Sequence, residues 1–276
     1  MNEKDEYSFK ASPVYLVPIA STLLISILCS LLFIGADVDI GYITLMPESG
    51  LGSIWNAIYF VILIAVGAYL MYFLLKKKLH LGINFLIGTA ISIIAFMLSF
   101  LYLDLLFAII NVEMNLWSLI FISVSATATV DYFIFSNHRI IHNILVLLIG
   151  GCLGAFLGMT IPTLSAIFIL LLLAVYDVIA VYYGPIGKIA SHGLENLPGV
   201  AFSFRDVHVG LGDLTFYSML ISHALIYFGW AACIFSLIGV LLGSIIAFKL
   251  LEKRGMFPGL PIPIILGLIF MYFSLV

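Results

Sequence analysis

Charged residues are scarce in this sequence. Asp, Glu, Lys and Arg together make up 9% of its 276 residues, whereas a soluble domain has about 25% because its surface must face water. This shortage excludes an ordinary soluble protein. The formal net charge of −3 says little by itself, and no nucleic-acid partner is expected.

Cysteine is also scarce. The three cysteines, Cys29, Cys152 and Cys233, all fall inside apolar stretches, and their spacing matches no metal site. We therefore expect them to pack as small apolar side chains. The sequence predicts no metal site and no other cofactor.

Hydrophobic residues are abundant and grouped. They make up 64% of the chain, and the mean hydropathy is +1.25. The apolar stretches are roughly 20 residues long, enough for a helix to cross a bilayer core of about 30 Å. The sequence predicts an all-α, polytopic membrane helix bundle of about nine spans, near 13–35, 54–75, 81–103, 116–135, 143–160, 162–183, 210–227, 230–251 and 257–276.

The predicted spans form a single membrane domain over residues 1–276. Six spans lie within 1–183, a cytoplasmic loop covers 184–209, and three spans lie within 210–276. All eleven Lys and Arg residues fall on one side of this arrangement, at Lys4, Lys10, Lys76, Lys77, Lys78, Arg139, Lys188, Arg205, Lys249, Lys253 and Arg254. Because cations concentrate in cytoplasmic loops, we expect a cell-membrane protein with a cytoplasmic N-terminus and an extracytoplasmic C-terminus.

Three aspartates, Asp131, Asp177 and Asp213, fall inside predicted spans. A carboxylate in a membrane helix costs roughly 2.5–3.5 kcal/mol at mid-depth, so each is a candidate functional residue. Asp131 lies near the cytoplasmic end of its span, where it can reach the interface or pair locally. Asp177 is the strongest candidate because apolar residues flank it on both sides.

Asp177 and Asp213 are expected to meet. The sixth span runs inward and the seventh runs outward from the same side, which places both carboxyls at similar depth in the inner leaflet. Two adjacent carboxyls in a poorly solvated site hold one proton between them. The ionised member can then take a proton from water while the protonated member polarises a scissile carbonyl, as aspartic protease chemistry requires.

Two further segments lie at the same depth. Gly210-Leu211-Gly212 precedes Asp213, and the glycines are expected to allow close backbone approach and φ values that other residues avoid. Pro258-Gly259-Leu260-Pro261-Ile262-Pro263 opens the ninth span, and its three prolines predict an irregular helix start. Irregular backbone at membrane depth is tolerated only where protein or a water-filled cavity covers it.

With these motifs the sequence resembles the presenilin and signal peptide peptidase family of intramembrane aspartyl proteases. Tyr176-Asp177 matches the Tyr-Asp motif of its sixth span, and Gly210-Leu211-Gly212-Asp213 matches the Gly-x-Gly-Asp motif of its seventh. Pro258-Gly259-Leu260 stands where the family has Pro-Ala-Leu. The expected N-inside orientation and the Pro-x-Leu-Pro form are similar to presenilin rather than to signal peptide peptidase. With its short loop between the sixth and seventh spans, the sequence most resembles an archaeal presenilin homologue.

The resemblance implies peptide-bond hydrolysis within the transmembrane helices of single-span substrates in the lipid bilayer. Asp177 and Asp213 would be catalytic. Support or substrate positioning would come from Tyr176, Gly210, Leu211, Gly212, Pro258, Gly259 and Leu260. No obligate accessory subunit is expected.

Two departures from the family stand out. Gly259 replaces the alanine and should loosen the turn. The loop 184–209 is much shorter than the cytosolic loop of presenilin, which leaves autocatalytic cleavage of this loop open. A further hypothesis is that the segment after the sixth span and Pro258–Pro263 offer an unwound substrate an edge for strand addition.

Other functions remain open on the sequence. A cation or proton-coupled transporter or channel also uses intramembrane aspartates. A transporter would favour inverted repeats and paired broken helices, which this sequence does not display. A prepilin-type peptidase shares the Gly-x-Gly-Asp aspartate but would not explain the Tyr-Asp motif or the proline-rich ninth span. His223 is expected to serve packing. The small residues are also expected to form helix-packing faces, namely the series Gly150, Gly154 and Gly158 and the pair Gly239 and Gly243.

Overall fold

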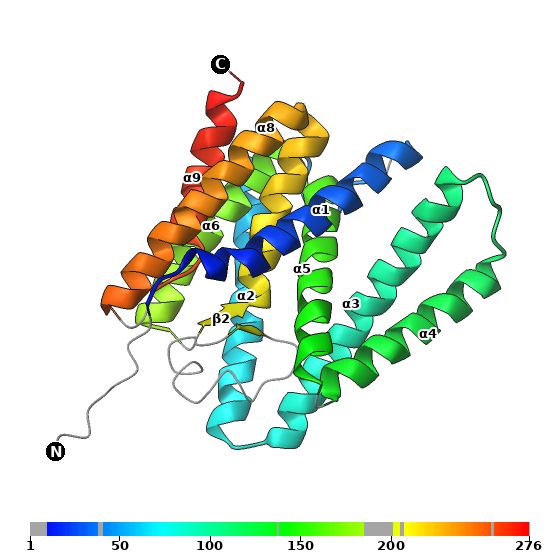
Figure 1. Ribbon diagram of the computed structural model, residues 1–276, viewed down its shortest axis with the longest axis horizontal. Helices are drawn as coiled ribbons and strands as arrows, with labels where there is room; N and C mark the ends of the chain where they lie inside the picture. The colour runs from blue at the N-terminus through cyan, green and yellow to red at the C-terminus, as the bar shows by residue number, and fades with distance from the viewer. Residues whose placement is uncertain are drawn as a thin grey trace.

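The structure, a computed structural model, describes residues 10–37, 41–136, 138–184, 201–204, 207–254 and 257–275. Nearly all of these residues are helical, and one short strand pair is added (Figure 1). The elements are η1 (Pro13–Tyr15), α1 (Leu16–Ala36), α2 (Gly50–Lys76), α3 (His80–Ile109), α4 (Leu116–Phe135), α5 (Arg139–Thr160), α6 (Thr163–Tyr182), β1 (Ala201–Phe204), β2 (Val207–Gly210), α8 (Leu211–Arg254) and α9 (Pro261–Phe273).

The helices confirm a multi-pass membrane protein. Seven helices in the described ranges are long and apolar enough to cross a membrane, with α8 counted once and α9 left out because it is shorter. At 44 residues α8 would be about 66 Å long, roughly twice the thickness of the bilayer core. It is divided at Gly229, where φ is 84° and ψ is −172°. The two parts of α8, 211–228 and 230–254, correspond to the predicted seventh and eighth spans.

The first part of α8 lies at the centre of the bundle. Every residue from 214 to 225 is buried, so this stretch is covered on all faces. It packs against α1, α5 and α9, and its apolar side chains join those of α1, α5 and α6 in the main core. The first part of α8, which carries Asp213, is therefore enclosed by neighbouring helices.

Glycines on α5 allow its close packing against α8. A Cβ on Gly158 would lie 2.8 Å from the main-chain oxygen of Met219, and one on Gly154 would lie 2.6 Å from that of Thr215. The second part of α8 packs on α9 in the same way, since a Cβ on Gly243 would meet the Cα of Pro263 at 2.5 Å. The predicted small-residue packing faces are thus present.

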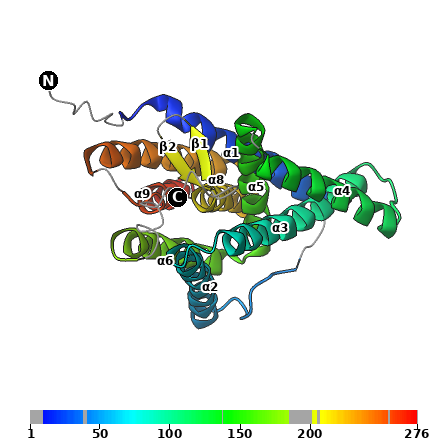
Figure 2. The same ribbon diagram turned by 90° about the horizontal axis from the view of Figure 1, so that it is seen from below.

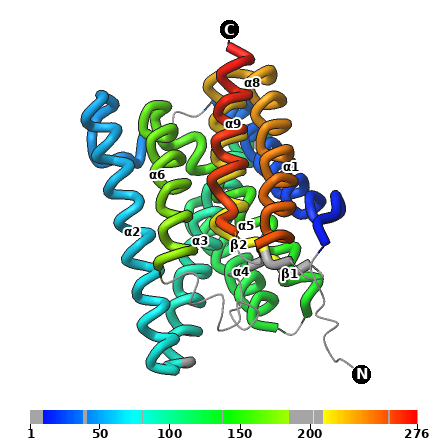
Figure 3. The backbone as a smooth tube through the Cα atoms, turned by 90° about the vertical axis from the view of Figure 1, so that its left-hand side faces the viewer, coloured from blue at the N-terminus to red at the C-terminus, as the bar shows by residue number. Residues whose placement is uncertain are grey.

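The remaining helices lie at the periphery. Figure 1 shows α3 and α4 side by side on the side of the bundle away from α9. In Figure 3, α2 stands next to α6 at the opposite edge from α1. These positions leave α6, which carries Asp177, between the exposed helix α2 and the buried group formed by α8 and α9.

A short strand pair is added to the predicted all-α bundle. β1 and β2 are antiparallel, with Ala201 opposite Gly210 and Phe204 opposite Val207, and the hairpin leads directly into α8 (Figure 2). Part of the predicted loop 184–209 is therefore regular structure. Gly210 ends a strand instead of beginning the seventh span, because its backbone pairs with Ala201.

Candidate active site

Asp177 and Asp213 are brought together at one end of the bundle. Asp177 lies five residues before the end of α6, about 7.5 Å along the helix axis, and is buried, with 9% of its surface exposed. Asp213 is the third residue of α8 and is partly buried. The two carboxyls are close enough to interact electrostatically, as the depth argument predicts.

Two consecutive residues before α9 contact the two carboxyls. The main-chain N–H of Leu260 donates a hydrogen bond of 3.0 Å to Oδ2 of Asp177. The Cα of Gly259 faces Asp213 so closely that an added Cβ would lie 2.6 Å from Oδ2 of that residue. The predicted support from Gly259 and Leu260 is therefore backbone contact with both aspartates.

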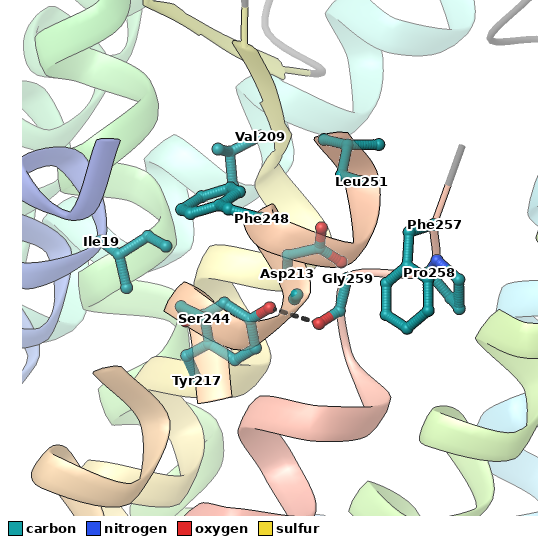
Figure 4. A pocket seen from close by; sticks show the side chains of 11 residues that line it. Ile19, Val209, Asp213, Tyr217, Ser244, Phe248, Leu251, Phe257, Pro258 and Gly259 are labelled. Carbon is teal, nitrogen blue, oxygen red and sulfur yellow. Dashed lines mark hydrogen bonds between the residues drawn. The ribbon is translucent and has the colours of Figure 1, made fainter. Parts of the chain in front are cut away.

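Tyr217, which was not predicted from the sequence, fixes this segment from the other side. Its hydroxyl donates a hydrogen bond of 2.8 Å to the main-chain oxygen of Gly259, and its side chain is buried (Figure 4). Tyr217 follows Asp213 by four residues, so both side chains lie on the same face of α8. The four-residue spacing from Asp213 was the only sequence feature that could have pointed to Tyr217. It becomes meaningful only once Gly259 is known to lie beside this face of α8.

A cavity of about 90 Å³ adjoins Asp213 (Figure 4). Its lining includes Asp213, Tyr217, Pro258 and Gly259, with Ile19 and Phe248 among the apolar residues that complete it. A water needs roughly 10–15 Å³ of such volume, so several waters fit beside the carboxyl. Pro258, predicted as a support residue, forms part of this wall.

The motif glycines do not act as predicted. Neither Gly210 nor Gly212 has a positive φ; among the described glycines only Gly229 does. A Cβ on Gly210 would meet Asp213 at 3.8 Å, and one on Gly212 would meet Phe216 at 4.0 Å, which are ordinary contacts. The expectation of special φ values is therefore wrong. Leu211 packs against Gly150 of α5 and so anchors the start of α8.

The proline-rich segment is only partly irregular. Residues 257–260 form no helix or strand, as predicted, but α9 begins at Pro261 and includes Pro263. Prolines are tolerated in a first helical turn because the N–H groups there have no partner within the helix. Residues 261–263 therefore offer no strand edge, and the other proposed edge, 185–192, lies outside the described residues.

The structure also locates three other residues that the sequence singled out. Tyr176 is partly exposed beside Asp177. Asp131 on α4 accepts a hydrogen bond of 2.7 Å from Ser92 of α3, so it pairs locally. His223 is buried and bonds the main-chain oxygen of Gly158 through Nδ1 at 2.8 Å and the hydroxyl of Thr163 through Nε2 at 3.1 Å, consistent with the predicted packing role.

Comparison with known proteins supports the same family. Residues 190–276 match the family model described as Presenilin. Presenilin-B of Dictyostelium discoideum is 33% identical over 145 residues, which cover 48% of this chain and 30% of that protein. Presenilin sel-12 of Caenorhabditis elegans is 43% identical over 70 residues, which cover 25% of this chain and 16% of that protein. The chain therefore matches less than a third of the length of these curated relatives.

The fold comparison covers nearly the whole chain. A solved structure of a presenilin family intramembrane aspartate protease matches 94% of this chain and 98% of its own, with a TM-score of 0.68 and 18% identity. A second such structure matches 95% of each chain, with a TM-score of 0.64 and 20% identity.

The fold is thus that of a presenilin-type membrane helix bundle. The resemblance to the presenilin family, first indicated by three short motifs, is confirmed by sequence over residues 190–276 and by fold over nearly the whole chain.

Proposed function

We propose that this protein is an intramembrane aspartyl protease that hydrolyses peptide bonds within transmembrane helices, with Asp177 and Asp213 as its catalytic pair. The observation that carries the proposal is the contact of Gly259 and Leu260, consecutive in the chain, with the two carboxyls. The third aspartate predicted to lie within a span, Asp131, accepts a hydrogen bond from Ser92 on α3. A transporter would not require two carboxyls held by one dipeptide.

The chemistry follows from the surroundings of each carboxyl. Asp177 accepts the Leu260 N–H, and an amide donor bonds an ionised oxygen more strongly than a neutral one. We therefore assign Asp177 as the base that takes a proton from water. Asp213 is the protonated member, which donates to the scissile carbonyl, and the cavity beside it has room for water. No metal or cofactor takes part in this assignment.

Substrates are proposed to be single-span transmembrane proteins or peptides within the bilayer. A helix must unwind before its backbone can be attacked, and its freed backbone groups then need partners. The β1–β2 hairpin, which leads into α8, supports strand addition near Asp213. Proline substitutions in β1 should then lower cleavage of a helical substrate more than cleavage of an unstructured one. Equal effects on both substrates would argue against strand addition.

We propose the orientation of the protein in the membrane from the positions of its Lys and Arg residues. Lys76 and Lys77 lie at the end of α2, Arg139 begins α5, and Arg254 ends α8. These helix ends lie in the lower half of Figure 1, where β2 also lies. By the positive-inside rule this end, with the site, is cytoplasmic.

The test uses purified protein in detergent and a tagged single-span substrate. Wild type should cleave, and Asp177→Asn and Asp213→Asn should each lower the rate by roughly 10³-fold or more. Asp131→Asn is the matched control, because it makes the same change at an intramembrane aspartate outside the pair, and it should cleave as wild type does. Cleavage by either pair variant at the wild-type rate would refute the assignment.

A further inference from the structure

We propose that Tyr217 is a positioning residue for the catalytic pair, acting through the main chain of Gly259 and Leu260. The inference rests on the proposed function and extends it to a residue outside the three family motifs. Its basis is a continuous chain of contacts: Tyr217 bonds the oxygen of Gly259, and the next residue, Leu260, bonds Asp177.

The segment it holds has little other regular structure to fix it. Residues 257–260 belong to no helix or strand. Pro258 and Pro261 flank the Gly259-Leu260 dipeptide and have no N–H, so this dipeptide supplies the main-chain donors between them. A shift of the Gly259 carbonyl therefore carries the Leu260 N–H away from Asp177.

Tyr217 is rigidly placed for this task. It lies one helical turn beyond Asp213 on the central, fully covered part of α8, and only 3% of its surface is exposed. A buried phenol requires a hydrogen-bond partner, and the Gly259 oxygen provides it at 2.8 Å. The phenol is also within electrostatic range of both carboxyls. Tyr217 thus fixes the distance between Asp213, which lies on the same helix, and the Gly259-Leu260 dipeptide, which contacts Asp177.

The decisive variant is Tyr217→Phe, which removes only the hydroxyl. Tyr227→Phe is the matched control, because Tyr227 lies on the same part of α8 and its hydroxyl donates 2.7 Å to the main-chain oxygen of Met159, away from the aspartates. The Leu260 bond acts on Asp177, so its loss should affect the chemical step: we expect kcat to fall roughly 10-fold in Tyr217→Phe with KM changed less than about 2-fold. Tyr227→Phe should keep the wild-type kcat.

Hydrogen exchange tests the contact between Tyr217 and Gly259 without a cleavage assay. Hydrogen exchange of the peptide containing residues 257–263 should become faster at the Leu260 amide in Tyr217→Phe and stay unchanged in Tyr227→Phe. If the Leu260 amide of Tyr217→Phe exchanges at the wild-type rate, the proposal is overturned. This result counts even if the wild type cleaves no substrate and the protease assignment fails. Faster exchange with an unchanged kcat would also overturn it, because the segment would then be held for no catalytic purpose.

Discussion

The space that a side chain of residue 259 would occupy is filled by the carboxyl of Asp213. A Cβ on Gly259 would lie 2.6 Å from Oδ2 and 3.1 Å from the carboxyl carbon of Asp213. Gly259 does not have a positive φ, so its backbone conformation is open to alanine. The glycine therefore matters here for the room it leaves to Asp213.

Gly259→Ala should lower activity without unfolding the protein. Carbon atoms pack at about 3.5–4.0 Å, so the carboxyl of Asp213 must move by roughly 1 Å. A displacement of that size at a catalytic group can reduce the rate roughly 100-fold. We expect kcat to fall by about 10- to 100-fold while the melting temperature in detergent stays the same.

This expectation bears on the family motif, which has alanine at the same place. An unchanged kcat in Gly259→Ala would mean that the Asp213 side chain turns aside without loss, and that the close approach has no catalytic importance. A lower melting temperature together with a lower kcat would point instead to a folding defect.

A second prediction concerns the contact between α5 and the first part of α8. A Cβ on Gly158 would lie 2.8 Å from the main-chain oxygen of Met219, and main-chain atoms of a packed helix cannot turn aside as a side chain can. Gly158→Ala should therefore lower the free energy of unfolding by about 1–3 kcal/mol, the usual effect of overpacking.

Gly67→Ala is the control for this experiment. Gly67 lies within α2, and a Cβ there would have no heavy atom within 4 Å. Alanine favours a helix over glycine, so this variant should unfold at the wild-type temperature or slightly above it. Equal melting temperatures for Gly158→Ala and wild type would show that the α5–α8 contact is looser than the structure indicates.

Much of the bundle could be predicted from the sequence. Long apolar stretches must be helical in lipid, so α1 to α6 were expected close to where they occur. Asp177 and Asp213 stood out because carboxylates within apolar helices are rare. The contacts of the two aspartates with Gly259 and Leu260 could not be predicted, because they depend on where the irregular segment 257–260 lies in space.

The errors have physical causes as well. The β1–β2 hairpin was missed because strands of four residues carry little periodicity and depend on pairing with each other. Tyr217 was missed because tyrosine is common in this chain, with 14 copies, and spacing alone did not single it out. The glycines before Asp213 were misread because glycine permits a positive φ without requiring it.

The break within α8 gives a prediction about backbone conformation. Gly229 has φ 84° and ψ −172°, a region that is essentially restricted to glycine, and a Cβ there would have no heavy atom within 4 Å. Gly229→Ala should therefore destabilise the protein by about 1–3 kcal/mol through strain alone. Gly229→Asn should cost as much, because asparagine tolerates the left-handed helical region and not this one. A wild-type melting temperature for either variant would contradict the backbone geometry.

The last prediction concerns the thiols of Cys29 on α1 and Cys152 on α5, whose Sγ atoms lie 3.4 Å apart. A disulfide requires about 2.05 Å, so a movement of little more than 1 Å brings the two sulfurs to bonding distance. A diazene oxidant such as diamide should join them: both thiols are oxidised, their two hydrogens pass to the diazene, and the product is a disulfide and a hydrazine.

Mass spectrometry under non-reducing conditions should then detect a peptide that joins α1 to α5. Cys29→Ser and Cys152→Ser should each abolish this cross-link, whereas Cys233→Ser should leave it, because Cys233 lies on α8 outside the pair. Since α1 and α5 both pack against the first part of α8, the cross-linked protein should unfold at a higher temperature and still cleave substrate. Failure of the wild type to cross-link, with its thiols shown to be reduced beforehand, would mean that α1 and α5 do not bring these two side chains together.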